Sequence, residues 1–258
     1  MILNRFERID SSAITPVSLV HGVWLKRDDL FSAFNASGGK ARACLELAGM
    51  TRCGLITAAA RKSPQGVIAA AIARGLAIEC RIHTASGVHT PEILQAISLG
   101  AKVVQHRPGY SSVIQARARA DAADRGWTLI PFGMEAQESI DLTAHQVSNI
   151  PSVVKRLVVP VGSGMTLAAI LWGLCRQRRE LPIAGVVVGA DPRSRLNQWA
   201  PSGWEERVKL LPARTSYAKV APQLAWGEVS LDPHYEAKCI PFLKHGDCLW
   251  IVGHRALR

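Results

Sequence analysis

The chain has 258 residues, of which 48% are hydrophobic and 20% charged, so it is long enough for one large domain or two modest ones with real cores. This composition excludes a mainly disordered chain and a coiled coil. The formal net charge of +11, from 31 Lys and Arg against 20 Asp and Glu, is compatible with a polyanionic partner. The six cysteines form no C-x-x-C pair and have no zinc-finger spacing, so we expect neither a disulfide framework nor a metal site.

The predicted elements alternate between strand and helix along most of the chain. In chain order we expect a strand over 23–29, a helix over 43–50, a strand over 54–60, a helix over 64–76, a strand over 77–84, a helix over 90–101, a strand over 102–106 and a helix over 111–126. A strand over 127–132, a helix over 135–150, a strand over 156–161, a helix over 166–179 and a strand over 183–191 follow. The segment 192–228 reads as irregular, and a last strand lies within 243–254. This alternation predicts an α/β fold with parallel sheets covered on both faces by helices.

Two segments bear on membranes and secretion. Residues 157–175 carry no charge and approach the length of a membrane span, but Pro160, Gly162 and Gly164 interrupt them, so we expect strand, turn and helix. The first ten residues carry four charges and no apolar core, so we expect no signal peptide. The prediction is a cytoplasmic protein without a membrane segment.

Three separated segments have the character of a functional site. Ser37-Gly38-Gly39-Lys40 places a lysine at a helix start, where a partly desolvated amine near other positive charge can act as a nucleophile. An apolar strand runs into the turn at 162–166 and then a helix, which is typical of a phosphate cradle. Tyr235 and Glu236 form a phenol and carboxylate pair after an Asp-Pro turn. Each has an ordinary alternative: a solvated helix start, a tight packing turn and a surface pair.

Together, and in this order, the segments resemble one family. The strings that carry the resemblance are Lys26-Arg-Asp-Asp-Leu30, Gly38-Gly-Lys40-x-Arg42, Lys62-Ser63-x-Gln65, Gly162-Ser-Gly-x-Thr166 and Leu231-Asp-Pro-x-Tyr-Glu-Ala-Lys238. They look like the pyridoxal-phosphate enzymes of the tryptophan-synthase β-like fold (fold type II), and are most similar to the aminocyclopropane-carboxylate deaminase and D-cysteine desulfhydrase branch. The resemblance runs from about residue 20 to the C-terminus and is strongest at the first and last strings.

The resemblance implies a fold and a division of the chain. It implies two three-layer α/β/α domains with mostly parallel sheets and the cofactor, pyridoxal 5′-phosphate, in the cleft between them. Residues 1–45 and 130–258 would form the large cofactor-binding domain, and residues 46–129 a small inserted α/β domain. We also expect a homodimer.

The resemblance also implies roles for individual residues. Lys40 would carry the cofactor as a Schiff base, Glu236 would face the pyridine nitrogen, and Tyr235 would donate or accept a proton near the substrate. Ser63 and Gln65 match the loop that binds the substrate carboxylate, and Ser63 also matches a proposed nucleophile or proton relay. The residues expected at the cofactor phosphate are Gly162, Ser163, Gly164, Met165 and Thr166.

The departures from the family pattern bear on the substrate. The asparagine that usually precedes the lysine is Gly39, the usual Ser-Asn-Gln is Ser63-Pro64-Gln65, and the segment between Asp191 and Glu228 is short. These departures argue against a plain deaminase of a free small amino acid. What the resemblance implies is an enzyme that forms an external aldimine with an amino-acid amine and breaks a bond at Cα by deamination, elimination or decarboxylation.

Three alternatives stay open for the substrate and the function. The amino acid is free, or it is an aminoacyl group on a modified thymine in bacteriophage DNA, bound through a basic surface in the host cytoplasm. An inactive homologue that binds nucleic acid is the third, although it would be expected to have lost Lys40.

Overall fold

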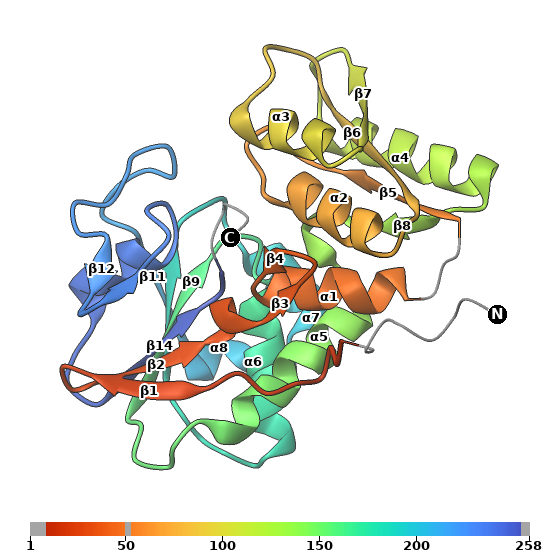
Figure 1. Cartoon of the computed structure of the whole chain (residues 1–258). Coiled ribbons are helices and arrows are strands. Elements are labelled where there is room, and N and C mark those ends of the chain that lie inside the picture. The colour runs from red at the N-terminus through yellow and green to blue at the C-terminus, as the bar shows by residue number, and fades with distance from the viewer. Residues whose placement is uncertain (1–8, 50–52, 254–258) are drawn as a thin grey trace.

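The computed structural model describes residues 9–49 and 53–253. Three predictions fall partly outside these ranges. They concern residues 1–8 of the opening segment, where we expect no signal peptide, residue 50 of the helix expected over 43–50, and residue 254 of the segment expected to hold the last strand. Within them the chain forms two larger sheets, which lie apart in Figure 1 with helices α1 and α5 between them. The fold is therefore mixed α/β.

The larger sheet has six strands in the order β1-β2-β14-β9-β10-β11. Strand β1 pairs with β2 in antiparallel fashion, and the other neighbours are parallel. Its strands are β1 (Val17–Val20), β2 (Val23–Arg27), β9 (Arg156–Val161), β10 (Ile183–Val187), β11 (Val208–Pro212) and β14 (Asp247–Ile251). Its helices are α5 (Gln137–His145), α6 (Met165–Arg176), α7 (Arg193–Trp199) and α8 (Trp204–Arg207).

Alternation along β9 assigns the two faces of this sheet. Leu157 and Val159 pack in one apolar cluster with side chains of α6, whereas Val158 belongs to a cluster on the opposite face. That second cluster contains Leu231 and Ala237, so the chain after β11 and the 3₁₀ helix η4 (Glu236–Phe242) cover this face. The segment that covers it also carries Tyr235 and Glu236, which positions both near the sheet.

The smaller sheet has four parallel strands in the order β7-β6-β5-β8. On β5, Leu55 packs with the cluster that contains α2, and Ile56 packs with Ile114 and Ala118 of α4, so helices cover both faces. Its strands are β5 (Gly54–Ala58), β6 (Glu79–Ala85), β7 (Lys102–His106) and β8 (Thr128–Ile130). The helices around it are α1 (Gly39–Ala48), α2 (Gln65–Gly75), α3 (Pro91–Ser98) and α4 (Ser111–Arg125).

The remaining short elements include two-stranded pairs and 3₁₀ turns. They are β3 (Ser32–Ala33), β4 (Ala36–Ser37), β12 (Ala225–Trp226), β13 (Val229–Ser230), η1 (Asp28–Leu30), η2 (Phe132–Met134) and η3 (Gln146–Asn149). The described part of the chain contains no helix with the length and apolarity of a membrane span. The uncharged stretch 157–175 forms β9, a turn and most of α6.

Three predictions about the elements were wrong. The segment 192–228 is not irregular throughout, because it contains α7, α8 and β11. Strand β11 is an edge strand that ends at Pro212, where the missing N–H is tolerated. Strand β1 precedes the first expected strand, and the helix expected over 135–150 ends at His145 and continues as η3. The domain boundaries at 45–46 and 129–130 stay a prediction.

Candidate functional site

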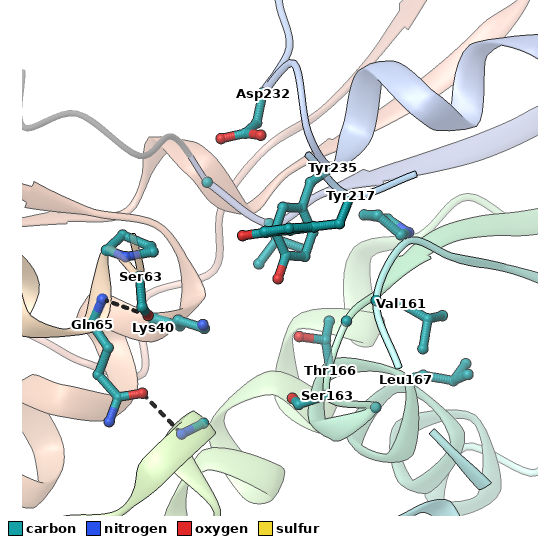
Figure 2. Close-up of a pocket in the computed structure, with 18 of the residues that line it drawn as sticks. Lys40, Ser63, Gln65, Val161, Ser163, Thr166, Leu167, Tyr217, Asp232 and Tyr235 are labelled. Carbon is teal, nitrogen blue, oxygen red and sulfur yellow. Dashed lines mark hydrogen bonds between the residues drawn. The ribbon is translucent and has the colours of Figure 1, made fainter. Parts of the chain in front are cut away.

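A cavity of about 340 Å³ lies where the starts of α1, α2 and α6 meet the end of β9 and the chain around η4. Figure 2 shows Lys40 and Ser63 on one side of it, Ser163 and Thr166 on the other, and Tyr217 and Tyr235 between them. Every site residue expected from the sequence lines this cavity except Met165. The Met165 side chain packs in the core beneath α6, so only its backbone belongs to the turn.

Lys40 is the second residue of α1, and a close backbone contact fixes its position. The Gly39 N–H donates to the Val252 carbonyl at 3.0 Å, and Gly38 has φ of +87°. A Cβ atom on Gly38 would lie 2.4 Å from that carbonyl oxygen, so a side chain there would push the start of the helix away from β14. The two glycines before Lys40 therefore hold its backbone against the end of β14.

Buried charges lie directly behind Lys40. Arg42 and Asp28 form an ion pair with exposed side-chain fractions of 0% and 1%. The second carboxylate oxygen of Asp28 lies 2.6 Å from the position of a Cβ on Gly39, next to the start of α1. Lys26 is also buried, and burial lowers the pKa of its amine to about 8. Its Nζ donates to the Thr15 carbonyl at 2.7 Å, so Lys26 supports the fold outside the cavity.

The turn between β9 and α6 forms a shallow cradle made largely of backbone. Gly164 has φ of +97°, and α6 starts at the next residue. A Cβ on Gly162 would lie 2.6 Å from the Tyr235 hydroxyl oxygen, and one on Gly164 would lie 3.3 Å from the Pro192 Cβ. A helix start with exposed N–H groups, nearby hydroxyls of Ser163 and Thr166 and no room for side chains is suited to a phosphate group.

Glu236 is fully buried, and only one of its two carboxyl oxygens is hydrogen-bonded to the described residues. Its Oε1 accepts the N–H groups of Val252 at 2.8 Å and Gly253 at 3.4 Å. Its Oε2 has no hydrogen-bond partner among the described residues, although the side chain lines the cavity. Burial, with a further contribution from the Asp232 carboxylate, raises the pKa of Glu236 to about 8. This carboxyl group is therefore mostly protonated at neutral pH.

Gln65 lines the cavity, but its amide is used elsewhere. Its side chain is 2% exposed. The Nε2 donates to the Thr57 hydroxyl and to the Pro131 carbonyl, both at 2.8 Å. The Oε1 accepts the Gly133 N–H at 2.8 Å, and Figure 2 draws this bond. The Gln65 N–H points to the Ser63 hydroxyl oxygen at 3.3 Å. The Gln65 side-chain amide therefore links β5 to the chain that follows β8. The Ser63 hydroxyl accepts the backbone N–H, so its own proton is available to donate.

The lining residues that sequence reasoning missed include Tyr217, Asp232 and Arg195. The Tyr217 ring packs edge-on against Tyr235, with ring centroids 5.8 Å apart. Asp232 is 3% exposed, and its Oδ1 accepts the His234 N–H at 2.8 Å. Asp232 lay within the last family string and could have been found there. Tyr217 and Arg195 lie in the segment expected to be irregular, which offered no comparable signal.

Comparison with known proteins gives one family from the sequence and one fold from the solved structures. The sequence profile of the family described as "Pyridoxal-phosphate dependent enzyme" matches residues 11–219. No curated protein matches the sequence. Among solved structures, an "ACC deaminase homologue" is 19% identical, with 96% of this chain and 92% of that chain covered and a TM-score of 0.78.

Other solved structures share the fold at lower identity. The processed form of threonine deaminase isoform 2 from Solanum lycopersicum is 15% identical, with 95% of this chain and 80% of that chain covered and a TM-score of 0.67. The serine racemase of Dictyostelium discoideum is 11% identical, with 93% and 91% covered and a TM-score of 0.67. These likenesses show the two-domain fold, and the profile covers most of the sequence. The chain belongs to the family of pyridoxal-phosphate-dependent enzymes.

Proposed function

We propose that this enzyme breaks a bond at the Cα atom of an amino-acid substrate, with Lys40 as the lysine that holds the cofactor. The observation that supports this proposal best is Glu236 Oε2, a buried carboxyl oxygen without a partner among the described residues, in the wall of the cavity that Lys40 also lines. A pyridine nitrogen is a suitable partner for such an oxygen. The cradle at 162–166 suits the phosphate. The residues present therefore fit three parts of the cofactor: Lys40 the covalent bond, Glu236 the ring nitrogen and the cradle the phosphate.

The roles of these residues follow from their chemistry. Lys40 Nζ would bind the cofactor covalently, and Glu236 Oε2 would share a proton with the ring nitrogen. When bound, the cofactor supplies an acceptor for the electron pair left at Cα. A carboxyl group at the ring nitrogen favours the protonated ring, which is the stronger acceptor.

Ser63 and Tyr235 are the candidates for contacts with the substrate. The Ser63 hydroxyl can donate to the substrate carboxylate or carry a proton. The Tyr235 hydroxyl, which lies against Gly162, can donate or accept a proton near the reacting carbon. Gln65 contributes through its backbone and through the position of the loop, because its amide is already bonded.

The experiment that tests this function combines cofactor binding and product detection. We expect a visible absorbance band after incubation with pyridoxal phosphate, a borohydride-stable mass increase on Lys40, and loss of both in Lys40→Ala. Lys62→Ala, a change at an exposed lysine three residues before the start of α2, is the matched control and should keep the band. A colourless wild-type protein would contradict the proposal. A screen of free amino acids for released ammonia, carbon dioxide or other products then identifies the bond that breaks.

One observation favours a larger substrate as a second candidate. A further cavity of about 560 Å³ shares Gly189 and Tyr217 with the first and is lined by Arg193 and Arg214. Together with the net charge of +11, this extension suits an amino acid carried on a polyanion such as DNA. Binding of a DNA duplex that weakens steeply with salt would support this candidate, and absence of binding at low salt would remove it.

A further inference from the structure

Arg195 is the second basic side chain of the cavity. Among the described residues that line it, Lys40 and Arg195 are the basic ones. Arg195 lies on α7, in the segment expected to be irregular, and its guanidinium forms an ion pair with Glu135. The two side chains are 32% and 24% exposed, so they are partly shielded from solvent. Lys40 is assigned to the covalent bond, which leaves Arg195 as a cation whose role in the cavity is open.

The position of the pair relative to the cradle is fixed by two close contacts. The start of α7 packs directly on the cradle, because a Cβ on Gly164 would lie 3.3 Å from Pro192 and 3.6 Å from Leu196, on either side of Arg195 in the chain. A Cβ on Gly133 would lie 3.5 Å from Glu135 Oε1 and 3.7 Å from the Ser163 Cβ. The ion pair therefore lies at the end of the cavity formed by the cradle.

Charge decides what this arrangement can bind. A helix start offers about half a positive charge, which is too little to neutralise the negative charge of a phosphate dianion. Glu135 adds a negative charge beside Ser163, and this would oppose a phosphate unless a cation lay between them. A guanidinium has five N–H donors in a planar fork, so it can hold Glu135 with one nitrogen and a phosphate oxygen with another.

We propose that Arg195 binds the phosphate group of the cofactor and that Glu135 holds its guanidinium in place. This inference rests on the proposed cofactor site and adds a side-chain cation to a cradle that the sequence assigned to backbone and hydroxyl groups.

The test compares two forms of the cofactor that differ only in the phosphate. The dissociation constants of pyridoxal phosphate and of pyridoxal are measured by absorbance titration for wild type, Arg195→Gln and Arg195→Lys. We expect Arg195→Gln to weaken pyridoxal phosphate about 10- to 100-fold, as for loss of a charged hydrogen bond, and to leave pyridoxal unchanged. Arg195→Lys should retain part of the affinity, because it keeps the charge without the fork.

A matched control is available on α6. Arg176 also pairs with a carboxylate, that of Asp141, but lies at the opposite end of that helix from the cradle, with 50% of its side chain exposed. Arg176→Gln should bind pyridoxal phosphate as wild type does. Unchanged urea unfolding and pyridoxal binding in Arg195→Gln show that the variant is folded.

The outcomes separate this inference from the function it rests on. If wild type fails to bind pyridoxal phosphate, the cofactor site itself is wrong. If wild type binds it and Arg195→Gln binds it equally well, or if the variant loses pyridoxal to the same extent, the role of Arg195 at the phosphate is refuted. Unchanged cofactor affinity with weaker binding of O-phospho-L-serine would instead assign Arg195 to an anionic substrate, and would also overturn the proposal.

Discussion

The carboxyl group of Glu236 makes a quantitative prediction about the protein without its cofactor. We consider the change Glu236→Gln, which keeps the size and the contact with the Val252 N–H but removes the ionisable group. Burial raises the pKa of Glu236 from 4.5 to about 8. Between these values the unfolded chain has lost the proton and the folded chain still holds it. Because the folded state then binds more protons, the free energy of unfolding falls as pH rises.

The magnitude follows from the two pKa values. At about 1.36 kcal/mol per pH unit, the interval from 4.5 to about 8 corresponds to a loss of about 5 kcal/mol. This loss is absent below about pH 4.5 and complete above about pH 8. The glutamine variant cannot ionise, so it should become more stable than wild type by a growing margin as pH rises through this window.

The assay is urea unfolding of cofactor-free protein at a series of pH values from about 5 to about 9. The difference in unfolding free energy between Glu236→Gln and wild type should widen across the series. Glu205→Gln, a change at an exposed glutamate of α8, is the control and should track wild type. With the cofactor bound, the ring nitrogen gives the ionised carboxylate a partner, and the wild-type curve should become flatter.

The result that would refute the reasoning is a constant difference between Glu236→Gln and wild type across the series. Parallel curves would mean that the carboxyl group ionises in the folded protein at an ordinary pH, and that Oε2 is solvated or paired. The proposed contact with the ring nitrogen would then lose its main structural support.

Three further predictions concern the surroundings of the cavity. Asp232→Asn removes a negative charge that raises the pKa of Glu236, so the pH dependence of stability should become shallower in the same urea series. Gln65→Leu leaves buried backbone groups without their partners and should lower the unfolding free energy by about 2–4 kcal/mol, measured at one pH by urea; a loss below about 1 kcal/mol would show that the amide is dispensable. Arg42→Met leaves Asp28 as an unpaired buried charge and should cost about 3–5 kcal/mol, and adding Asp28→Asn should recover much of it.

Much of the cavity could be predicted because its parts are local. The glycines before Lys40 and within 162–166 mark turns at helix starts, and the carboxyl ends of parallel strands bring such turns to one edge of a sheet. The string that contains Tyr235 and Glu236 predicted the residues near the cofactor ring. Each of these signals lies within a few residues of the chain.

The residues that sequence reasoning missed depend on long-range contacts. Arg195 reaches the cavity because α7 packs against the turn at 162–166, and Tyr217 follows β11, the edge strand of the large sheet. The local sequence around these two residues does not specify either contact. Gln65 shows the reverse case. Its position was predicted, but its amide turns toward Thr57 and Gly133, a direction set by the chain after β8. Side-chain direction, unlike a helix start, is decided by neighbours distant in sequence.

The end of β14 has a consequence for how the site comes into being. The Val252 carbonyl accepts from Gly39 beside Lys40, and the N–H groups of Val252 and Gly253 bind Glu236. The two sides of the cavity are thus joined by the two lining residues that come last in chain order, after all the others. A nascent chain on the ribosome can fold the small sheet early, yet it cannot complete the cavity until residue 253 has emerged. Capture of the cofactor is therefore expected only once residue 253 has emerged, and chains that stop before this residue should not retain the cofactor.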